Sequence, residues 1–173
     1  VGMIPREDAD IIAKNAHGAS LQRAKEIEDE IHHDMMAIVK AVSEVCGEAG
    51  RWIHYGATSN DILDTATGLQ LRDALDIIET KLKQILDVLL NRAEQTKDLI
   101  CIGRTHGQHG VPTTYGLRFA IWASEIGRHI ERLKQMRPRV CVGQLTGAVG
   151  TQAALGDKGI QVQECMMKYL NLS

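Results

Sequence analysis

The chain has 173 residues, of which 44% are hydrophobic and 24% are charged, the balance of an ordinary globular protein. A net charge of −2 gives no electrostatic basis for binding nucleic acid or an anionic membrane, and no apolar run reaches the ~20 residues of a membrane span. The four cysteines lack the spacing of a zinc site or a disulfide framework, so we interpret them as reduced thiols of a cytoplasmic protein.

The first part of the chain predicts a short helix followed by a long one. Residues 6–14 form the short helix, with Pro5 tolerated at its start and an end near Gly18. From Ser20, a suitable N-cap, apolar residues recur every three or four positions up to Gly47, which predicts one amphipathic helix. The recurring residues are Ala24, Ile27, Ile31, Met35, Ile38, Val42 and Val45.

A second long helix is predicted from about residue 60 to residue 95, with Ser59, Asn60 or Asp61 as its cap. Its apolar residues alternate in steps of four and three, the seam of a helix bundle. The seam consists of Leu71, Leu75, Ile78, Leu82, Ile85 and Leu89. A helix this long spans about 50 Å at 1.5 Å per residue, which indicates an elongated bundle completed by other chains.

The remaining elements complete an all-α class. A short extended piece is expected at residues 99–102, and a polar loop follows at residues 102–116. A third helix is expected over residues 114–136, ended by Pro138, and a last helix over residues 158–170. We therefore predict an elongated helical bundle with long antiparallel helices.

Four polar clusters interrupt this pattern. His32-His33-Asp34 lies inside the first predicted long helix, where neighbours differ by about 100° in direction, so at most two can face one pocket. A solvated helix face is the alternative. Residues 54–61, HYGATSND, are either a helix cap or, with their free N–H groups, a carboxylate or phosphate site. The small residues of Thr146–Thr151 can simply allow a close crossing of chains.

The densest cluster is residues 102–116, IGRTHGQHGVPTTYG. Arg104 can bind a carboxylate through two hydrogen bonds, and His106 can transfer a proton near neutral pH. Gly107 and Gly110 allow the backbone to approach a ligand closely. A polar turn between helices is the alternative interpretation.

The histidines do not predict a metal site. His106 and His109 have ligand-like spacing, but no H-E-x-x-H motif and no cluster of carboxylates or cysteines accompanies them. The glycine-rich phosphate loops of nucleotide-binding proteins are also missing, so we predict no cofactor.

Taken together, the clusters resemble the adenylosuccinate lyase family of the fumarase and aspartase superfamily. The matching segments, in the family's order, are HDMMA at 33–37, HYGATSNDILDTA at 54–66, GRTHGQHG at 103–110, PTTYG at 112–116 and LTGAVGT at 145–151. The resemblance implies a β-elimination that releases fumarate from adenylosuccinate and from SAICAR, the carboxamide intermediate of purine biosynthesis.

The chemistry of such an elimination suits these residue types. Removing a proton next to a carboxylate builds an aci-carboxylate dianion that needs preorganised donors, and the departing nitrogen needs a proton. The resemblance implies that His106 is the general acid, with Thr105, Gln108 and Arg104 as substrate-binding groups near it. It implies that Thr58 and Ser59 bind the succinyl carboxylate.

The resemblance also assigns the first cluster. His33 and Asp34 correspond to a pair that contacts the substrate, and His54 corresponds to a catalytic-site histidine. His32 stands where the family usually has arginine, and it is a weaker, conditional cation.

The resemblance further implies a homotetramer whose active sites combine residues from several subunits. The family's serine base, in a G-S-S-x-M-P-x-K-x-N-P signature, does not occur in these 173 residues. We therefore expect residues 1–56 to be the end of an N-terminal helical domain and residues 57–173 to be the first part of a central helical bundle. We expect this chain to be inactive by itself.

Two other classes of function remain open. One is a different superfamily member, such as argininosuccinate lyase or carboxymuconate cycloisomerase, although the cycloisomerase generally lacks a histidine at the position of His106. The other is a non-catalytic helical assembly module, which would explain the apolar seams but not four polar clusters.

Overall fold

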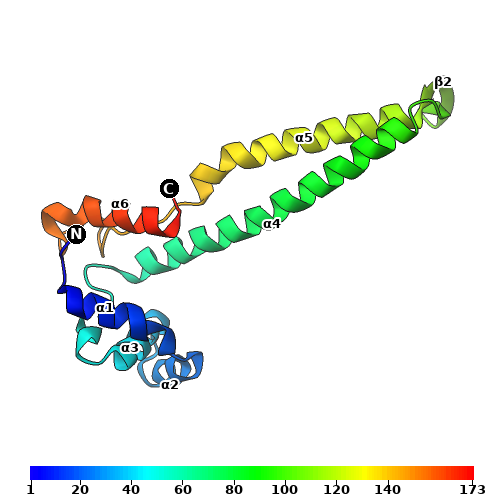
Figure 1. The fold of residues 1–173 in the computed structure, drawn as a ribbon. Helices are drawn as coiled ribbons and strands as arrows, with labels where there is room; N and C mark the ends of the chain where they lie inside the picture. The colour runs from blue at the N-terminus through cyan, green and yellow to red at the C-terminus, as the bar shows by residue number, and fades with distance from the viewer. The chain divides into compact units, whose positions relative to one another are not determined.

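The computed structural model describes residues 1–173 and is predominantly helical, which confirms the predicted class (Figure 1). Two compact units divide the chain: residues 1–67 with 143–173, called unit 1, and residues 68–142, called unit 2. Helix α4 contributes residues to both. The expected domain division near residue 56 stays a prediction. None of the helices has both the length and the apolar character needed to cross a membrane.

Unit 1 begins with three helices, α1 (Arg6–Asn15), α2 (Leu21–Ile31) and α3 (Asp34–Cys46). Ile27 of α2 packs with Ala37 and Ala41 of α3 in a small core. The Arg23 guanidinium holds the Glu44 carboxylate through two 2.9 Å hydrogen bonds, which join the solvent sides of α2 and α3. Ser20 caps α2, as expected, by accepting a hydrogen bond from the Arg23 N–H.

The prediction of one helix from Ser20 to Gly47 is wrong. The chain breaks between α2 and α3, where His32 takes a left-handed conformation with φ 52° and His33 becomes the N-cap of α3. The apolar spacing continues across this break because both helices bury residues in the same core. The break could not be predicted from this spacing, because a left-handed conformation at a residue other than glycine does not change the apolar pattern.

The segment between α3 and α4 contacts two other parts of unit 1. The 3₁₀ segment Gly47–Trp52 follows α3, and the Trp52 indole donates a 2.7 Å hydrogen bond to Asp8 of α1. Gly56, at φ 73°, lies so close to Leu155 that a Cβ atom would be 2.5 Å from its side chain. The last helix, α6 (Gly159–Leu170), follows the short 3₁₀ segment Gly156–Lys158.

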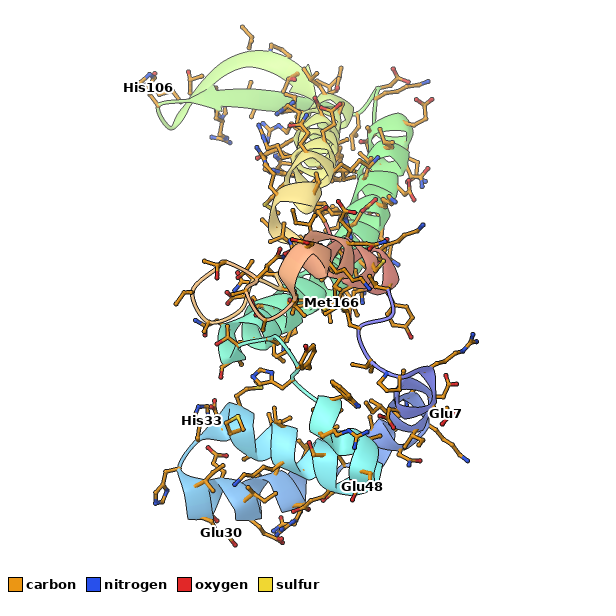
Figure 2. The ribbon with its side chains drawn as sticks, turned by 90° about the vertical axis from the view of Figure 1, so that its left-hand side faces the viewer. Glu7, Glu30, His33, Glu48, His106 and Met166 are labelled. Carbon is orange, nitrogen blue, oxygen red and sulfur yellow. The ribbon has the colours of Figure 1, made fainter.

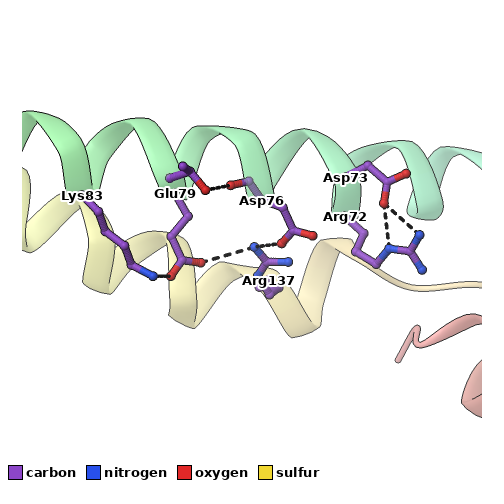
Figure 3. Close-up of polar contacts among 7 residues, drawn as sticks. Arg72, Asp73, Asp76, Glu79, Lys83 and Arg137 are labelled. Carbon is purple, nitrogen blue, oxygen red and sulfur yellow. Dashed lines mark hydrogen bonds and ion pairs between the residues drawn. The ribbon is translucent and has the colours of Figure 1, made fainter.

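Unit 2 contains the greater part of α4 (Ser59–Gln95), strands β1 (Ile100–Thr105) and β2 (Gln108–Thr114), and α5 (Tyr115–Val140). Its two helices lie side by side and antiparallel (Figure 1). Arg137 near the end of α5 binds Asp76 at 2.8 Å and Glu79 at 3.4 Å (Figure 3). At the other end, the Gly116 N–H donates to the Thr96 carbonyl.

The apolar seam of α4 is only partly covered within the chain. Leu75 is 6% exposed, and Ala123, Ile130 and Leu133 of α5 are buried as well. Ile78 and Ile85, on the same predicted seam, are 47% and 45% exposed. The seam is therefore wider than one partner helix can bury.

Two details of unit 2 differ from the sequence-based expectation. Residues 102–116, expected as a loop, form most of an antiparallel β-hairpin, because a two-residue turn lets the flanking segments pair from Ile100 with Thr114 to Thr105 with Gln108. The α5 helix does not end at Pro138 but continues to Val140. Pro138 lies in the last turn, and the Cys141 N–H still donates to the Arg137 carbonyl, which closes that turn.

The contact between α4 and α5 can be tested with two glycines of α5. At Gly116 an added Cβ would be 2.5 Å from the Lys97 Cα and 2.6 Å from the Ala93 carbonyl oxygen, whereas at Gly127 it would meet nothing within 4 Å. We expect Gly116→Ala to lower the free energy of unfolding by about 1–3 kcal/mol through overpacking. Gly127→Ala should raise it by about 0.5–1 kcal/mol through helix propensity. Urea unfolding of the two variants measures both changes, and equal signs would contradict this packing.

Candidate functional site

The residues singled out by sequence fall into two groups. His32, His33, Asp34, His54, Thr58 and Ser59 belong to unit 1. Arg104, Thr105, His106 and Gln108 belong to the hairpin of unit 2.

The first group begins at the junction of α2 and α3 (Figure 2). The His33 Nδ1 accepts a 3.3 Å hydrogen bond from the Met36 N–H and lies 3.6 Å from an Asp34 carboxylate oxygen. This orients the imidazole and leaves Nε2 unengaged. Because the helix breaks here, the limit that a continuous helix sets on which of these side chains share a pocket does not apply.

His54 lies in the turn between Trp52 and Thr58. Its φ of 68° is left-handed, and its Nδ1 is buried without a hydrogen-bond partner. Buried polar atoms are nearly always paired, and an exception calls for an explanation such as a ligand or an ordered water. His54 is thus the one site residue with an unmet hydrogen-bonding atom inside the protein.

Thr58 and Ser59 mark the start of α4. The Thr58 N–H donates a 2.9 Å hydrogen bond to the Asp61 carboxylate, three residues on, in the manner of a capping box. The sequence analysis named Asp61 only as a possible cap. The structure shows more, because its carboxylate is completely buried and also binds a distant segment.

That segment is the glycine-rich stretch around Thr146. The Asp61 carboxylate accepts hydrogen bonds from the Thr146 N–H at 3.0 Å, the Thr146 hydroxyl at 3.3 Å and the Gly147 N–H at 2.9 Å. Four donors therefore surround one buried charge. The sequence indicated only the local part of this role, because Asp61 follows Thr58 at capping-box spacing, and nothing in the pattern linked it to Thr146.

The environment of Asp61 acts on its acidity in two directions. Burial raises the pKa of the carboxyl, but the N–H groups of Thr146, Thr58 and Gly147, together with the Gln144 side chain, outweigh burial, so the pKa lies below its ordinary value. No lysine, arginine or histidine pairs with Asp61. Uncharged donors, without a partner cation, thus keep the carboxylate ionised.

The second group surrounds the turn of the hairpin. His106 and Gly107 have φ values of 50° and 73°, and they connect the paired residues Thr105 and Gln108 (Figure 2). Two positive φ values in a two-residue loop indicate a type I′ turn, for which Asn-Gly is the common sequence. The exposed His106 imidazole therefore projects from a short turn of fixed geometry. Arg104 makes no ion pair and lies opposite His109.

Left-handed backbone is concentrated at the predicted site. Five residues other than glycine have positive φ, and three of them are His32, His54 and His106. Such conformations cost about 1–3 kcal/mol each and are found preferentially at functional sites. The roles of these three histidines stay predictions.

The described side chains form no group of three or more His, Cys, Asp or Glu that could hold a metal ion. Proton transfer by histidine and anion binding by N–H and hydroxyl donors are what the two groups can supply chemically.

Comparison with known proteins places this chain in a family of lyases. The profile of a protein family described as Lyase matches residues 4–173. An adenylosuccinate lyase of Methanocaldococcus jannaschii is 53% identical over 175 residues, which cover 99% of this chain and 38% of that protein. An adenylosuccinate lyase of Pyrococcus abyssi is 53% identical over 174 residues, covering 99% and 39%. These sequences confirm the resemblance that the motifs predicted, and the chain spans less than half the length of either relative.

Solved structures show the same fold. A fumarate lyase from Mesorhizobium sp. BNC1 matches with a TM-score of 0.92 and 37% identity over 99% of this chain and 41% of that chain. A 3-carboxy-cis,cis-muconate lactonizing enzyme from Pseudomonas putida matches with a TM-score of 0.89 and 36% identity, covering 99% and 40%.

The four-donor arrangement around Asp61 predicts a pH-dependent contribution to stability. Because the pKa of Asp61 is lowered in the folded protein, its contribution is full above the unfolded-state pKa of about 3.9 and is lost as pH falls through the folded-state pKa. We expect Asp61→Asn to lower the free energy of unfolding by about 2–4 kcal/mol at pH 7 and by clearly less at pH 3.

Urea unfolding of both proteins at the two pH values measures this difference. The control is Asp157→Asn, at an exposed carboxylate, which should change the unfolding free energy by less than about 0.5 kcal/mol at either pH. A loss at Asp61 that is the same at pH 7 and pH 3 would show that the carboxylate does not act as an ion.

Proposed function

Because the chain belongs to the lyase family, we propose that the full-length protein is an adenylosuccinate lyase. It would release fumarate from adenylosuccinate and from SAICAR by β-elimination, in purine biosynthesis. The observation that carries the proposal is the 53% identity to archaeal adenylosuccinate lyases along nearly the whole chain. His106 lies in a two-residue turn that fixes its backbone, which suits a side chain that must hold its imidazole toward a substrate.

His106 is the proposed general acid. The departing nitrogen of the succinyl group needs a proton, and a protonated imidazole can give it. The hairpin contributes three further polar groups, which we assign to substrate binding: the Thr105 hydroxyl, the Gln108 amide and the unpaired Arg104 guanidinium. A guanidinium without an internal partner is available for a substrate carboxylate or phosphate.

The start of α4 is the proposed binding site for the succinyl carboxylate. The hydroxyls of Thr58 and Ser59 have no internal hydrogen-bond partner, and the positive end of the helix macrodipole lies beside them. Such donors also favour the dianionic aci-carboxylate that forms when the neighbouring carbon loses its proton.

The histidine cluster completes the assignment. His33, with its Nε2 unengaged, and Asp34 contact the substrate, and His32 supplies a conditional cation beside them. The unpaired, buried Nδ1 of His54 gains its hydrogen-bond partner when the substrate or an ordered water is present. The general base lies on a serine-containing loop of the full-length enzyme, outside residues 1–173.

Assembly and location are also part of the proposal. A homotetramer would cover apolar side chains such as Ile77, Ile78 and Val88, which are exposed on α4 of the single chain. The four cysteines are unpaired, which agrees with the reducing cytoplasm.

One alternative has a specific observation in its favour. The solved lactonizing enzyme of Pseudomonas putida superimposes with a TM-score of 0.89, so a cycloisomerase of the same fold remains a candidate. Fold alone does not decide between the two reactions. The role of His106 does, because the cycloisomerase family generally has no histidine at that position.

The decisive variant is His106→Asn in the full-length enzyme. Asparagine suits the left-handed first position of a type I′ turn, so the hairpin should keep its stability within about 0.5 kcal/mol. Losing the proton donor should lower kcat for fumarate release from adenylosuccinate by about 10²–10⁴-fold.

The matched control is His109→Asn, three residues away on the same hairpin, which should leave kcat within about threefold of the wild type. If His106→Asn releases fumarate at the wild-type rate, both the proton-donor role and the proposed reaction are wrong.

The chain by itself should not catalyse the elimination, because the proposal places the general base outside residues 1–173. The test is to incubate purified residues 1–173 with adenylosuccinate and to measure fumarate against a buffer blank. Release above the blank, with turnover, would refute the external base.

A further inference from the structure

The Asp61 carboxylate determines which donors at the start of α4 remain for a ligand. The first N–H groups of a helix have no partner within the helix and can bind an anion. Here the Thr58 N–H is engaged by Asp61, and the Asp61 N–H is engaged by the Thr58 carbonyl at 3.1 Å. Between them, the N–H groups of Ser59 and Asn60 have no partner, and neither do the hydroxyls of Thr58 and Ser59.

The same carboxylate joins this helix end to a segment 85 residues further along the chain. One oxygen, Oδ1, accepts from the Thr146 N–H and hydroxyl, and Oδ2 accepts from the N–H groups of Gly147 and Thr58. The backbone of Thr58 and the backbone of Gly147 are therefore held by one atom. A displacement of the Thr146 segment would be transmitted to the first turn of α4.

Asp61 itself cannot contact a substrate, since its side chain is 0% exposed. A negative charge next to a binding site for a dianion repels the ligand. The dipoles of the four donors around Asp61 offset part of this repulsion, although the carboxylate stays ionised. Asp61 therefore contributes to the site by holding neighbouring backbone in position, and it does not bind the substrate directly.

We propose that Asp61 is a positioning residue of the lyase reaction, which acts by fixing the first turn of α4 so that Ser59 and the free N–H groups beside it meet the substrate carboxylate. The inference rests on the proposed function and deepens it. It places the carboxylate on the Ser59 and Asn60 N–H groups and the Ser59 hydroxyl, because the Thr58 and Gly147 N–H groups are already occupied.

Thr65 provides a matched control on the same helix. It lies one turn after Asp61, is 6% exposed, and also binds the distant segment. Its hydroxyl donates to the Gln144 carbonyl at 3.1 Å and accepts from the Gln144 N–H at 3.0 Å. Thr65→Val removes a comparable link between the same two segments but leaves the first turn of α4 untouched.

The test is a double-mutant cycle in the full-length enzyme, with KM and kcat for adenylosuccinate as readouts. Ser59→Ala should raise KM about tenfold, and Asp61→Asn should raise it by a similar or larger factor, with a smaller change in kcat. If Asp61 acts through Ser59, the Ser59→Ala effect should shrink to less than about threefold in the Asp61→Asn background.

Thr65→Val should lower thermal stability while leaving KM and the full effect of Ser59→Ala in place. The inference is overturned if the factors by which Asp61→Asn and Ser59→Ala raise KM simply multiply in the double variant. It is also overturned if Thr65→Val raises KM as much as Asp61→Asn does. If Asp61→Asn does not fold, Thr146→Val decides, because it removes only the hydroxyl donor to Asp61. It should raise KM about threefold and reduce the effect of Ser59→Ala.

The inference and the proposed function fail in different ways. A Ser59→Ala variant with wild-type KM overturns the positioning role, while loss of turnover in His106→Asn still supports the elimination. A His106→Asn variant with wild-type turnover overturns the reaction, whatever the cycle shows.

Discussion

A buried carboxylate without a cation is the constraint on which the organisation of unit 1 depends. An ionised group away from water is tolerated only if nearly all of its lone pairs receive hydrogen bonds. Asp61 meets this condition with four donors from two segments that are far apart in sequence. Moving either segment leaves a charge uncompensated, so the arrangement has little tolerance for intermediate positions. The packing of Gly56 on Leu155 holds the polar turn before α4 against the segment that follows Thr146.

A second theme is the conflict between backbone preference and side-chain chemistry. Glycine or asparagine would adopt the left-handed conformations of His32, His54 and His106 with less strain. The chain has an imidazole at all three positions, at an energetic disadvantage to the fold. The remaining structure must hold these residues in place, as the capping of α3 by His33 and the pairing of Thr105 with Gln108 do. This pattern is expected where a side chain is required for chemistry.

The sequence predicted the helical class, the end of α4 at Gln95 and the Ser20 cap, because apolar periodicity and capping residues act locally. It did not predict the break at His32, since the spacing of Ile31 and Met35 is the same in one helix or in two that share a core. The hairpin was not predicted, because its many glycines and histidines leave no alternation of apolar and polar residues, which is the pattern that indicates a strand. The role of Asp61 could not be predicted, because its partners Thr146 and Gly147 become neighbours only in the folded unit. The motifs, in contrast, identified the candidate residues without any knowledge of these contacts.

The hairpin turn also restricts how this protein can vary among relatives. A loop of only two residues, His106 and Gly107, leaves no slack between Thr105 and Gln108. The pairing already shifts by one residue between Ile102 and Arg104, but inserting or deleting a residue between Arg104 and His109 would break the pair of Thr105 with Gln108, so these two residues would no longer flank the imidazole as they do here. Residue types along β1 and β2 can change, but the number of residues from Arg104 to His109 is fixed by the register. Length, more than composition, is therefore the property of this segment that evolution or an engineer has to preserve.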